Sequence, residues 1–323
     1  NVDYTAMSDA PVGTLLLRGL GMEVVESWAF AGVAAAIVDV RDNLLRELQP
    51  YSFGNVTTLD IKFGGNTRLR RLSNFSFSAM RLDSRAVLEL GSVGLTTIDP
   101  LAFHGVDCTS LQLAGNALSH LPSSSFAGIS LSGDLNLSNS SVANIEPHVF
   151  SGTVVGGSVL LSHNHLTTFQ ANTFSQLAVS RDVDLSQNPV EAVEPFAGQG
   201  LTVAGFLNLS MCEQLHDIAP DAFSGATLGG LDLSSLPMLQ QLGSFFLRGL
   251  RIPSVDLTVL RLESTPLHQL QANAFGGVVL TSTTARIATL DLSAVGLEVI
   301  GPNAFDGLRV GDVLLQGNQL PSL

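Results

Sequence analysis

The residues of this chain best suited to chemistry are two histidines in alternate positions and two cysteines. His163 and His165 flank Asn164, a spacing that can hold zinc or copper, but no third ligand lies near them in the sequence. Phosphate-binding glycine loops, Gly-x-Ser-x-Gly elbows and His-Glu-x-x-His motifs do not occur in the sequence. We therefore expect no metal, no cofactor and no enzymatic activity.

Charge is the second feature that bears on function. The net charge of −13 disfavours nucleic acid and anionic membranes as partners. Nine of the fifteen basic residues lie within positions 1–85, and a cluster there is formed by Arg68, Arg70, Arg71, Arg81 and Arg85. An acidic glycan is a conceivable ligand for this cluster, although a solvated flank is the simpler interpretation. No run of eighteen apolar residues occurs, so no membrane insertion is expected within this segment.

A repeat of 23 or 24 residues over most of the chain sets the elements that carry these residues. Each copy opens with an apolar-x-apolar strand, and the strands start at Leu15, Val38, Leu59, Leu88, Leu111, Leu135, Val159, Val183, Leu207, Leu231, Leu260, Leu290 and Val313. A phenylalanine stands fifteen residues after most starts, at Phe30, Phe53, Phe103, Phe126, Phe150, Phe174, Phe246, Phe275 and Phe305, and Phe196 and Phe223 are assigned to the same place. One such unit cannot bury its apolar face alone, so neighbouring units must stack.

The best copies read Leu-Gln-Leu-Ala-Gly-Asn116-Ala-Leu118 and Val-Leu-Leu-Ser-His-Asn164-His-Leu166. This pattern resembles the leucine-rich-repeat family, in particular the 24-residue form common in extracellular animal-type proteins. The resemblance implies an α/β solenoid, a curved horseshoe with a parallel β-sheet on its concave face and short turns or helical turns on its convex face. We expect a lead-in or partial cap at 1–14 and one solenoid at 15–323, with about thirteen repeats of which the last is incomplete.

In this family an asparagine after each strand bonds to the backbone of the turn and ties one coil to the next. It stands at Asn43, Asn116, Asn164, Asn188 and Asn318, with Ser140, Cys212 and Thr265 as substitutes. It is missing at Leu20, Gly64, Val93, Leu236 and Val295. Cys212 therefore has a structural interpretation, and it lies about four repeats from Cys108, roughly 20 Å away and too far for a disulfide.

Three long repeats begin at Leu59, Leu231 and Leu260. Their extra residues are placed in bulges on the convex side, at Met80–Val87, Arg251–Thr258 and Thr281–Thr289. Trp28, the only tryptophan, is interpreted as packing within the N-terminal coil.

The outward residues of the strands form the concave face, which is the candidate binding surface. At its N-terminal end an acidic column lies beside a basic one, formed by Arg18, Asp39, Arg41, Asp60, Lys62 and Glu89. Stacked like charges repel across neighbouring strands, and the adjacent column of opposite sign offsets this. A solvated polar face is the favoured interpretation, and a charged site for a partner is the alternative.

Five Asn-x-Ser/Thr sequons, at Asn55, Asn74, Asn136, Asn139 and Asn208, weakly favour a secreted glycoprotein. The family resemblance implies protein recognition, most often as an extracellular or cell-surface receptor or adhesion ectodomain. Two alternatives remain open. One is a structural segment of an extracellular polymer or matrix that self-associates, and the other is an intracellular scaffold or inhibitor. Occupied sequons would exclude the intracellular one.

Overall fold

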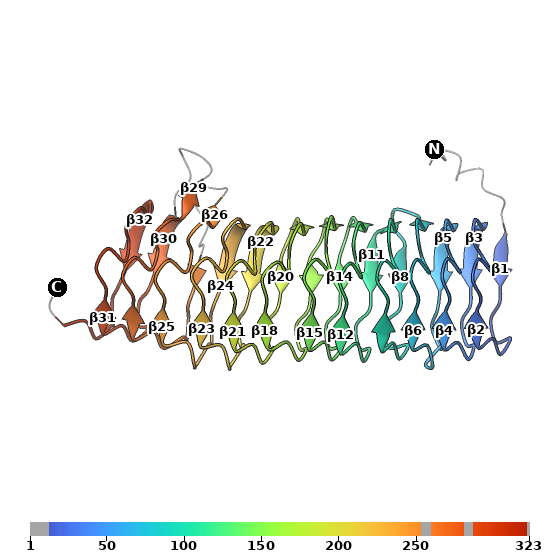
Figure 1. The fold of residues 1–323 in the computed structure, drawn as a ribbon, viewed down its shortest axis with the longest axis horizontal. Helices are drawn as coiled ribbons and strands as arrows, with labels where there is room; N and C mark the ends of the chain where they lie inside the picture. Colours follow the sequence, from blue (N-terminus) through green and yellow to red (C-terminus); the bar gives the residue numbers. More distant parts are fainter. Residues whose placement is uncertain (1–12, 253–259, 281–286, 322–323) are drawn as a thin grey trace.

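The computed structural model describes residues 13–252, 260–280 and 287–321, which form one elongated stack of coils. The first coil and the last lie at opposite ends of the stack (Figure 1). Each coil contributes short strands to three rows that run along the long axis. Where neighbouring strands of a row pair, they pair in parallel, as Leu111 with Leu135 and Leu135 with Val159.

The first and second rows belong to one large sheet as far as β29, and β30 and β32 continue them as a separate two-stranded sheet. The first row holds β7 (Arg81–Leu82), β10 (Asp107–Cys108), β13 (Ser130–Leu131), β16 (Val154–Val155), β19 (Ala178–Val179), β26 (Arg251–Ile252) and β29 (Val279–Leu280). The second row holds β1 (Thr14–Leu16), β8 (Val87–Glu89), β11 (Ser110–Gln112), β14 (Leu135–Asn136), β17 (Val159–Leu160), β20 (Val183–Asp184) and β27 (Leu260–Arg261).

Longer strands run through both of these rows: β3 (Ala34–Asp39), β5 (Thr57–Lys62), β22 (Thr202–Asn208), β24 (Thr227–Asp232), β30 (Ile287–Asp291) and β32 (Val310–Leu314). The third row is made of two-residue strands: β2 (Val24–Val25), β4 (Glu47–Leu48), β6 (Arg71–Leu72), β9 (Thr97–Ile98), β12 (His120–Leu121), β15 (Asn144–Ile145), β18 (Thr168–Phe169), β21 (Ala192–Val193), β23 (Asp217–Ile218), β25 (Gln241–Leu242), β28 (Gln269–Leu270) and β31 (Val299–Ile300).

The described residues contain no helix, so the architecture is a parallel β-solenoid and the expected α/β class and helical turns are not found. The turn that carries the phenylalanine shows why. In one coil it holds Ser124 at φ 63° and Gly128 at φ 71°, on either side of Phe126. Left-handed residues at that spacing interrupt any right-handed helix. Only turns and short strands therefore connect the rows.

The same feature explains why the stack in Figure 1 is nearly straight and not a horseshoe. Packed helices lie about 8–10 Å apart, whereas strands lie about 4.8 Å apart, so a helical convex side fans the coils out. Here every side of the coil is extended chain or tight turn. The coils have the same height all round, and the expected curvature is absent.

The core is a continuous cluster of apolar side chains with a phenylalanine spine at its centre. Stacked ring centroids lie 5.5–6.3 Å apart in the series Phe53, Phe77, Phe103, Phe126, Phe150 and Phe174, all at most 2% exposed. Phe77 completes this series and was missed in the sequence pattern. The spine stops at the next coil, where a glycine stands at the equivalent position. The Gly198 amide donates to the Ala222 carbonyl, just as the Phe126 amide donates to the Val149 carbonyl. Gly198 thus takes the spine position, and the assignment of Phe196 to it is wrong, since Phe196 is 43% exposed.

The third strand start is also corrected. Val38 pairs with Ile61 and Asp39 with Lys62, so the repeat starts at Ile61 and not at Leu59, which is 40% exposed. The segment Leu59-Asp-Ile-Lys-Phe63 alternates over five residues, and a shift of two residues keeps every side chain on its face. Hydrophobic alternation alone therefore could not distinguish the two registers.

The asparagine ladder is present and longer than expected. Asn164 Nδ2 donates to the carbonyls of Leu137 and Leu161, each at 2.9 Å, and its Oδ1 accepts from the amides of Ser140 and Val142 at 2.9 and 3.0 Å. With the corrected start, Asn66 joins the ladder, donating to Val40 and Phe63 carbonyls at 2.9 and 2.7 Å.

The three proposed ladder substitutes make the same kind of contact with the preceding coil. The Thr265 hydroxyl donates to the Leu233 carbonyl at 2.6 Å, and the Cys212 thiol and the Ser140 hydroxyl donate to the carbonyls of Leu185 and Leu113. Both cysteines are free and buried. A small polar side chain at this position is therefore sufficient to bond to the neighbouring coil.

The expected position of the bulges on a convex side is not found in the described part of the chain. Arg81–Leu82 and Arg251–Ile252 are first-row strands, so the insertions follow the first row at its corner with the second. Most of the second and third proposed bulges lies outside the described residues, as does most of the expected lead-in at 1–14.

Candidate interaction surface

The outward side chains of the second row form one continuous surface, here called the sheet face. In register they are Leu16, Asp39, Lys62, Glu89, Gln112, Asn136, Leu160, Asp184, Asn208, Asp232 and Arg261, and Asp291 and Leu314 form a further pair in the separate sheet of β30 and β32. Lys62 thus stands between Asp39 and Glu89, whereas Asp60 pairs with Ile37. The expected stacking of Arg18, Arg41 and Lys62 as one basic column is wrong by this register, and the signs alternate over Asp39, Lys62 and Glu89 instead.

At the N-terminal end of the face, each base is matched by an acid. Arg41 binds Asp39 through two bonds of 2.6 and 2.8 Å. Arg18 lies 2.7 Å from Asp42, and the Lys62 amine lies 3.3 Å from Asp60. The Arg41 guanidinium beside Asp39 lowers the pKa of that carboxyl to about 2, against the opposing effect of burial. These pairs leave little unmatched basic charge for a partner.

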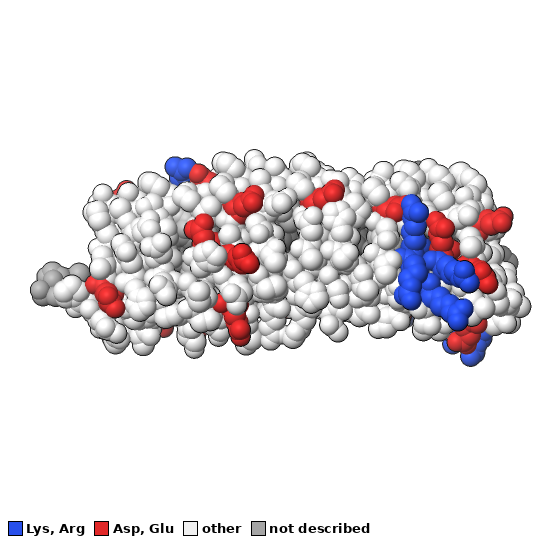
Figure 2. Space-filling view, turned by 60° about the horizontal axis from the view of Figure 1, so that its bottom comes forward, with Lys and Arg blue, Asp and Glu red and all other residues white. Residues whose placement is uncertain are grey.

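The arginine cluster is divided among different rows. Arg71 is in the third row and lies 2.8 Å from Asp99, whose side chain is largely buried, and 4.0 Å from Glu47. Arg70 donates to the Gly94 carbonyl, while Arg81 is in the first row in register with Asp107. Figure 2 shows that basic side chains gather toward the N-terminal end of one face, with scattered acidic residues over the rest. Arg68 and Arg85 are exposed.

A hollow in the sheet face near β20, β22 and β24 was not visible in the sequence pattern. Its volume is about 340 Å³, and it is lined by Ser158, Leu160, Asp182, Asp184, Phe206, Asn208, Asp232 and Arg261. The Arg261 guanidinium lies 3.9 Å from the centre of the Phe206 ring, and its Nη1 lies 3.2 Å from Asp232 Oδ2. A planar cation on an aromatic ring makes a rigid platform.

Two carboxylates beside this platform are held by neutral donors. Asp182 accepts from the Phe206 amide at 2.7 Å, and Asp184 accepts from Asn208 Nδ2 at 3.0 Å. Neither forms an ion pair within the described residues. The alternation of side chains along the strands predicts that Asp184 and Asn208 lie on one face. It does not predict the contact between Phe206 and Arg261, which are 55 positions apart in the sequence and meet only because the coils stack.

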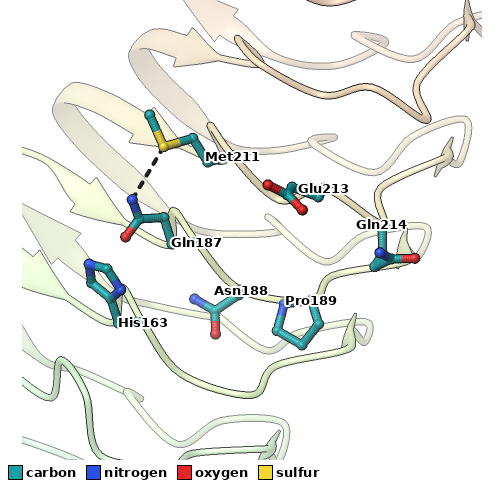
Figure 3. Close-up of a pocket in the computed structure, with 7 residues that line it drawn as sticks. All are labelled: His163, Gln187, Asn188, Pro189, Met211, Glu213 and Gln214. Atoms are coloured by element: carbon teal, nitrogen blue, oxygen red, sulfur yellow. Dashed lines mark hydrogen bonds between the residues drawn. The ribbon is translucent and has the colours of Figure 1, made fainter.

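A second hollow, of about 530 Å³, follows the second row in the middle of the stack. Figure 3 shows His163, Gln187 and Met211 in line on its wall, with Glu213 and Gln214 further round it. Gln187 Nε2 lies 3.2 Å from Met211 Sδ. His163 and His165 are both exposed, and nowhere in the described ranges do three metal-binding side chains of His, Cys, Asp or Glu gather. The side chains of His163, Gln187, Glu213 and Gln214 could make polar contacts to a ligand in this hollow.

The five sequon asparagines fall into two groups. Asn55, Asn74 and Asn139 are exposed. Asn136 and Asn208 are half-buried on the sheet face, where their Oδ1 atoms accept from the amides of Ser138 and Ser210. Among the described residues, no helix is long and apolar enough to cross a membrane.

Comparison with known families identifies the type of repeat. The profile of the BspA type leucine-rich-repeat region matches six copies in overlapping stretches, 48–180 and 96–229, which together cover more than half of the 323 residues. No curated protein matches the chain significantly. The leucine-rich-repeat assignment is therefore confirmed, and the expected animal-type subtype is wrong. A solenoid of such repeats suggests an interaction scaffold. The chain belongs to the BspA-type leucine-rich-repeat family.

Proposed function

We propose that the protein is a non-enzymatic recognition module, at the cell surface or outside the cell, that binds a protein partner through its sheet face. A rigid solenoid presents a long surface whose side chains are fixed by the register of its coils. The hollow beside Phe206 and Arg261 carries the proposal, because it combines an aromatic–cation platform with two carboxylates that have no ion-pair partner among the described residues. A lysine or arginine of the partner would pair with Asp182 or Asp184.

The partner contact can be tested with a photo-crosslinking residue in the native source. Leu160 lines the hollow, and Thr168 belongs to the third row of the same coil, and both are half-buried. We expect a discrete crosslinked product from position 160 and none from position 168. Changing both Asp182 and Asp184 to asparagine should weaken partner binding about tenfold, as expected for loss of a central contact. Equal products from both positions, or none from either, would contradict the sheet face as the binding surface.

The location is tested by glycopeptide mass spectrometry on native protein. A secretory route predicts glycans on the exposed Asn55, Asn74 or Asn139. Asn208 should stay unmodified, because a glycan there would fill the hollow that the partner enters. Five bare asparagines would argue for an intracellular protein, and a glycan on Asn208 would exclude binding at the hollow.

A further inference from the structure

The corner between the second and third rows is longer in two neighbouring coils than in most others. From the ladder position to the third-row strand a regular coil advances four residues, as from Asn188 to Ala192. The next two coils, with Cys212 and Leu236 at the ladder position, advance five residues to β23 and β25. Two exposed residues then stand where a regular coil has one, and these two pairs are here called the corner ridge: Glu213, Gln214, Pro237 and Met238.

The fold does not need the extra residue. The long corner closes with the Leu215 amide donating to the Cys212 carbonyl at 2.9 Å. The regular corner two coils later closes with the Leu267 amide donating to the Thr265 carbonyl, also at 2.9 Å. Both leucines are fully buried, so the long corner gains neither burial nor backbone bonding. It gains only exposed side chains, which raise the ridge above the preceding coil.

The second hollow lies against one side of the corner ridge. Its volume is about 530 Å³, and Glu213 and Gln214 line it from the ridge while Pro189 lines it from the preceding regular coil. This volume is within the range of small-molecule sites. Because the ridge closes the hollow in the direction of the stack, an extended chain that follows the corner over several coils does not fit. A compact ligand does.

Long side chains line the hollow at backbone positions that favour short ones. The residue directly before the ladder position has a positive φ, between 50 and 78°, in every coil that the structure describes. Ten coils have a short residue there: Gly19, Asp42, Gly65, Ser92, Gly115, Asn139, Ser235, Ser264, Ala294 and Gly317. Three consecutive coils instead carry His163, Gln187 and Met211, and all three line the hollow (Figure 3). Glutamine and methionine are unusual at positive φ, so backbone preference does not explain them.

Packing does not explain these long side chains either. Bulky left-handed residues at another turn stack closely, as Trp28 does on Tyr51 at 4.3 Å. Trp28 is itself 60% exposed and is not the core residue expected from the sequence. Along the wall of the hollow, Gln187 Nε2 lies 3.2 Å from Met211 Sδ, which is only a weak acceptor. Long side chains at disfavoured positions without a stacked neighbour indicate a role in binding.

The chemistry of the lining indicates the class of ligand. Within the described residues, the His163 ring, the Glu213 carboxylate and the Gln214 side-chain amide have no hydrogen-bond partner. An apolar ligand would leave these groups unpaired, and an anion would meet Glu213 with no lysine or arginine in the lining. A simple cation would use the carboxylate alone. Hydroxyl groups match the lining, because each of them both donates and accepts.

We propose that the second hollow binds a neutral sugar residue. Neighbouring hydroxyls of the ring donate to Glu213 and exchange hydrogen bonds with the amides of Gln187 and Gln214. The C–H face of the ring lies on Met211 and Pro189, which removes apolar surface from water. The same ring is presented by the end of a glycan chain and by the middle of a polysaccharide. This site is separate from the hollow of the sheet face, which other residues line.

Sugar binding can be measured by saturation-transfer NMR and calorimetry. The probes are the methyl glycosides of glucose, galactose, mannose and N-acetylglucosamine, and neutral oligosaccharides that carry each sugar at the end or in the middle of the chain. We expect at least one probe to bind, and Gln187→Asn and Glu213→Gln each to raise its dissociation constant at least about tenfold. Asparagine suits the left-handed backbone, as Asn139 does two coils earlier, so Gln187→Asn should fold. Preference for the end or for the middle of the chain distinguishes a glycan terminus from a polysaccharide.

Two substitutions of the same kind lie away from the hollow and serve as controls. Gln176 is exposed with φ 60°, and Glu194 is exposed just after the third row. Gln176→Asn and Glu194→Gln should leave sugar binding unchanged. Deletion of Gln214 restores the four-residue advance and should abolish binding, while circular dichroism should show the fold retained.

Three results would overturn the proposal: no probe binds the wild type, binding persists in both Gln187→Asn and Glu213→Gln, or trialanine binds at the hollow more tightly than any glycoside, which indicates a peptide site. The variants at the hollow should retain the crosslink from position 160. Loss of that crosslink with intact sugar binding would contradict only the sheet-face proposal, and the reverse result only the sugar site.

Discussion

Replacing Asn164 with alanine should lower the free energy of unfolding by about 3–5 kcal/mol. The side chain is 3% exposed and bonds to two carbonyls and two amides of its own and the preceding coil. Without it these backbone groups stay buried with fewer partners, and each unsatisfied group costs about 1–3 kcal/mol. Denaturant titration followed by circular dichroism measures the loss, and hydrogen exchange should place it at the coils on either side of residue 164.

Two substitutions control this prediction. Asn144 is an exposed third-row asparagine, and its change to alanine should cost no more than about 0.5 kcal/mol. Asn164→Ser should retain part of the stability, because the Ser140 hydroxyl already donates to a carbonyl of the preceding coil from this position. Equal losses for Asn164→Ala and Asn144→Ala would show that the ladder does not hold the coils together.

The second large effect is expected at the phenylalanine spine. Phe150 is fully buried and stacks between Phe126 and Phe174, at 5.8 and 6.3 Å. Phe150→Ala removes an aromatic side chain from a core that cannot close the space, so the free energy of unfolding should fall by about 3–5 kcal/mol. Thermal and denaturant unfolding of the purified variant measure this directly.

Phe196→Ala is the matched control, because the sequence pattern gave Phe196 the same role. Its ring is 43% exposed and the spine position in that coil is Gly198, so the loss should stay below about 1 kcal/mol. A loss as large as that of Phe150→Ala would place Phe196 back in the core.

The parts of the fold that could be predicted from sequence are those with a strict period. The leucines, the phenylalanines and the ladder asparagines recur at fixed spacing, and each fills one buried position per coil. The parallel sheet follows, since one coil cannot bury its own apolar face. These positions are predictable because burial and backbone bonding leave few residue types that fit.

What could not be predicted depends on backbone conformation or on contacts between distant coils. Leu59 and Ile61 are equally acceptable strand starts by alternation, and only the pairing with Val38 decides between them. The left-handed residues at Ser124 and Gly128, which exclude helices and straighten the stack, carry no periodic apolar signal. The platform of Phe206 and Arg261 joins strands two coils apart.

The surfaces described here all depend on the alignment of successive coils, and paired cysteines test that alignment most directly. Asp39 and Lys62 are in register, so their Cα atoms lie about 4.8 Å apart, within the range that a disulfide spans. Asp60 is offset by two residues and lies about 8 Å from Asp39, which is beyond that range. Burial raises the pKa of the native Cys108 and Cys212 thiols to about 12 and about 11, so they should not compete.

We would oxidise the two double variants under mild conditions and map the disulfides by mass spectrometry. We expect a bridge in Asp39→Cys with Lys62→Cys, and none in Asp39→Cys with Asp60→Cys. A bridge in the second variant and none in the first would restore the repeat start at Leu59 and contradict the order of residues along the sheet face.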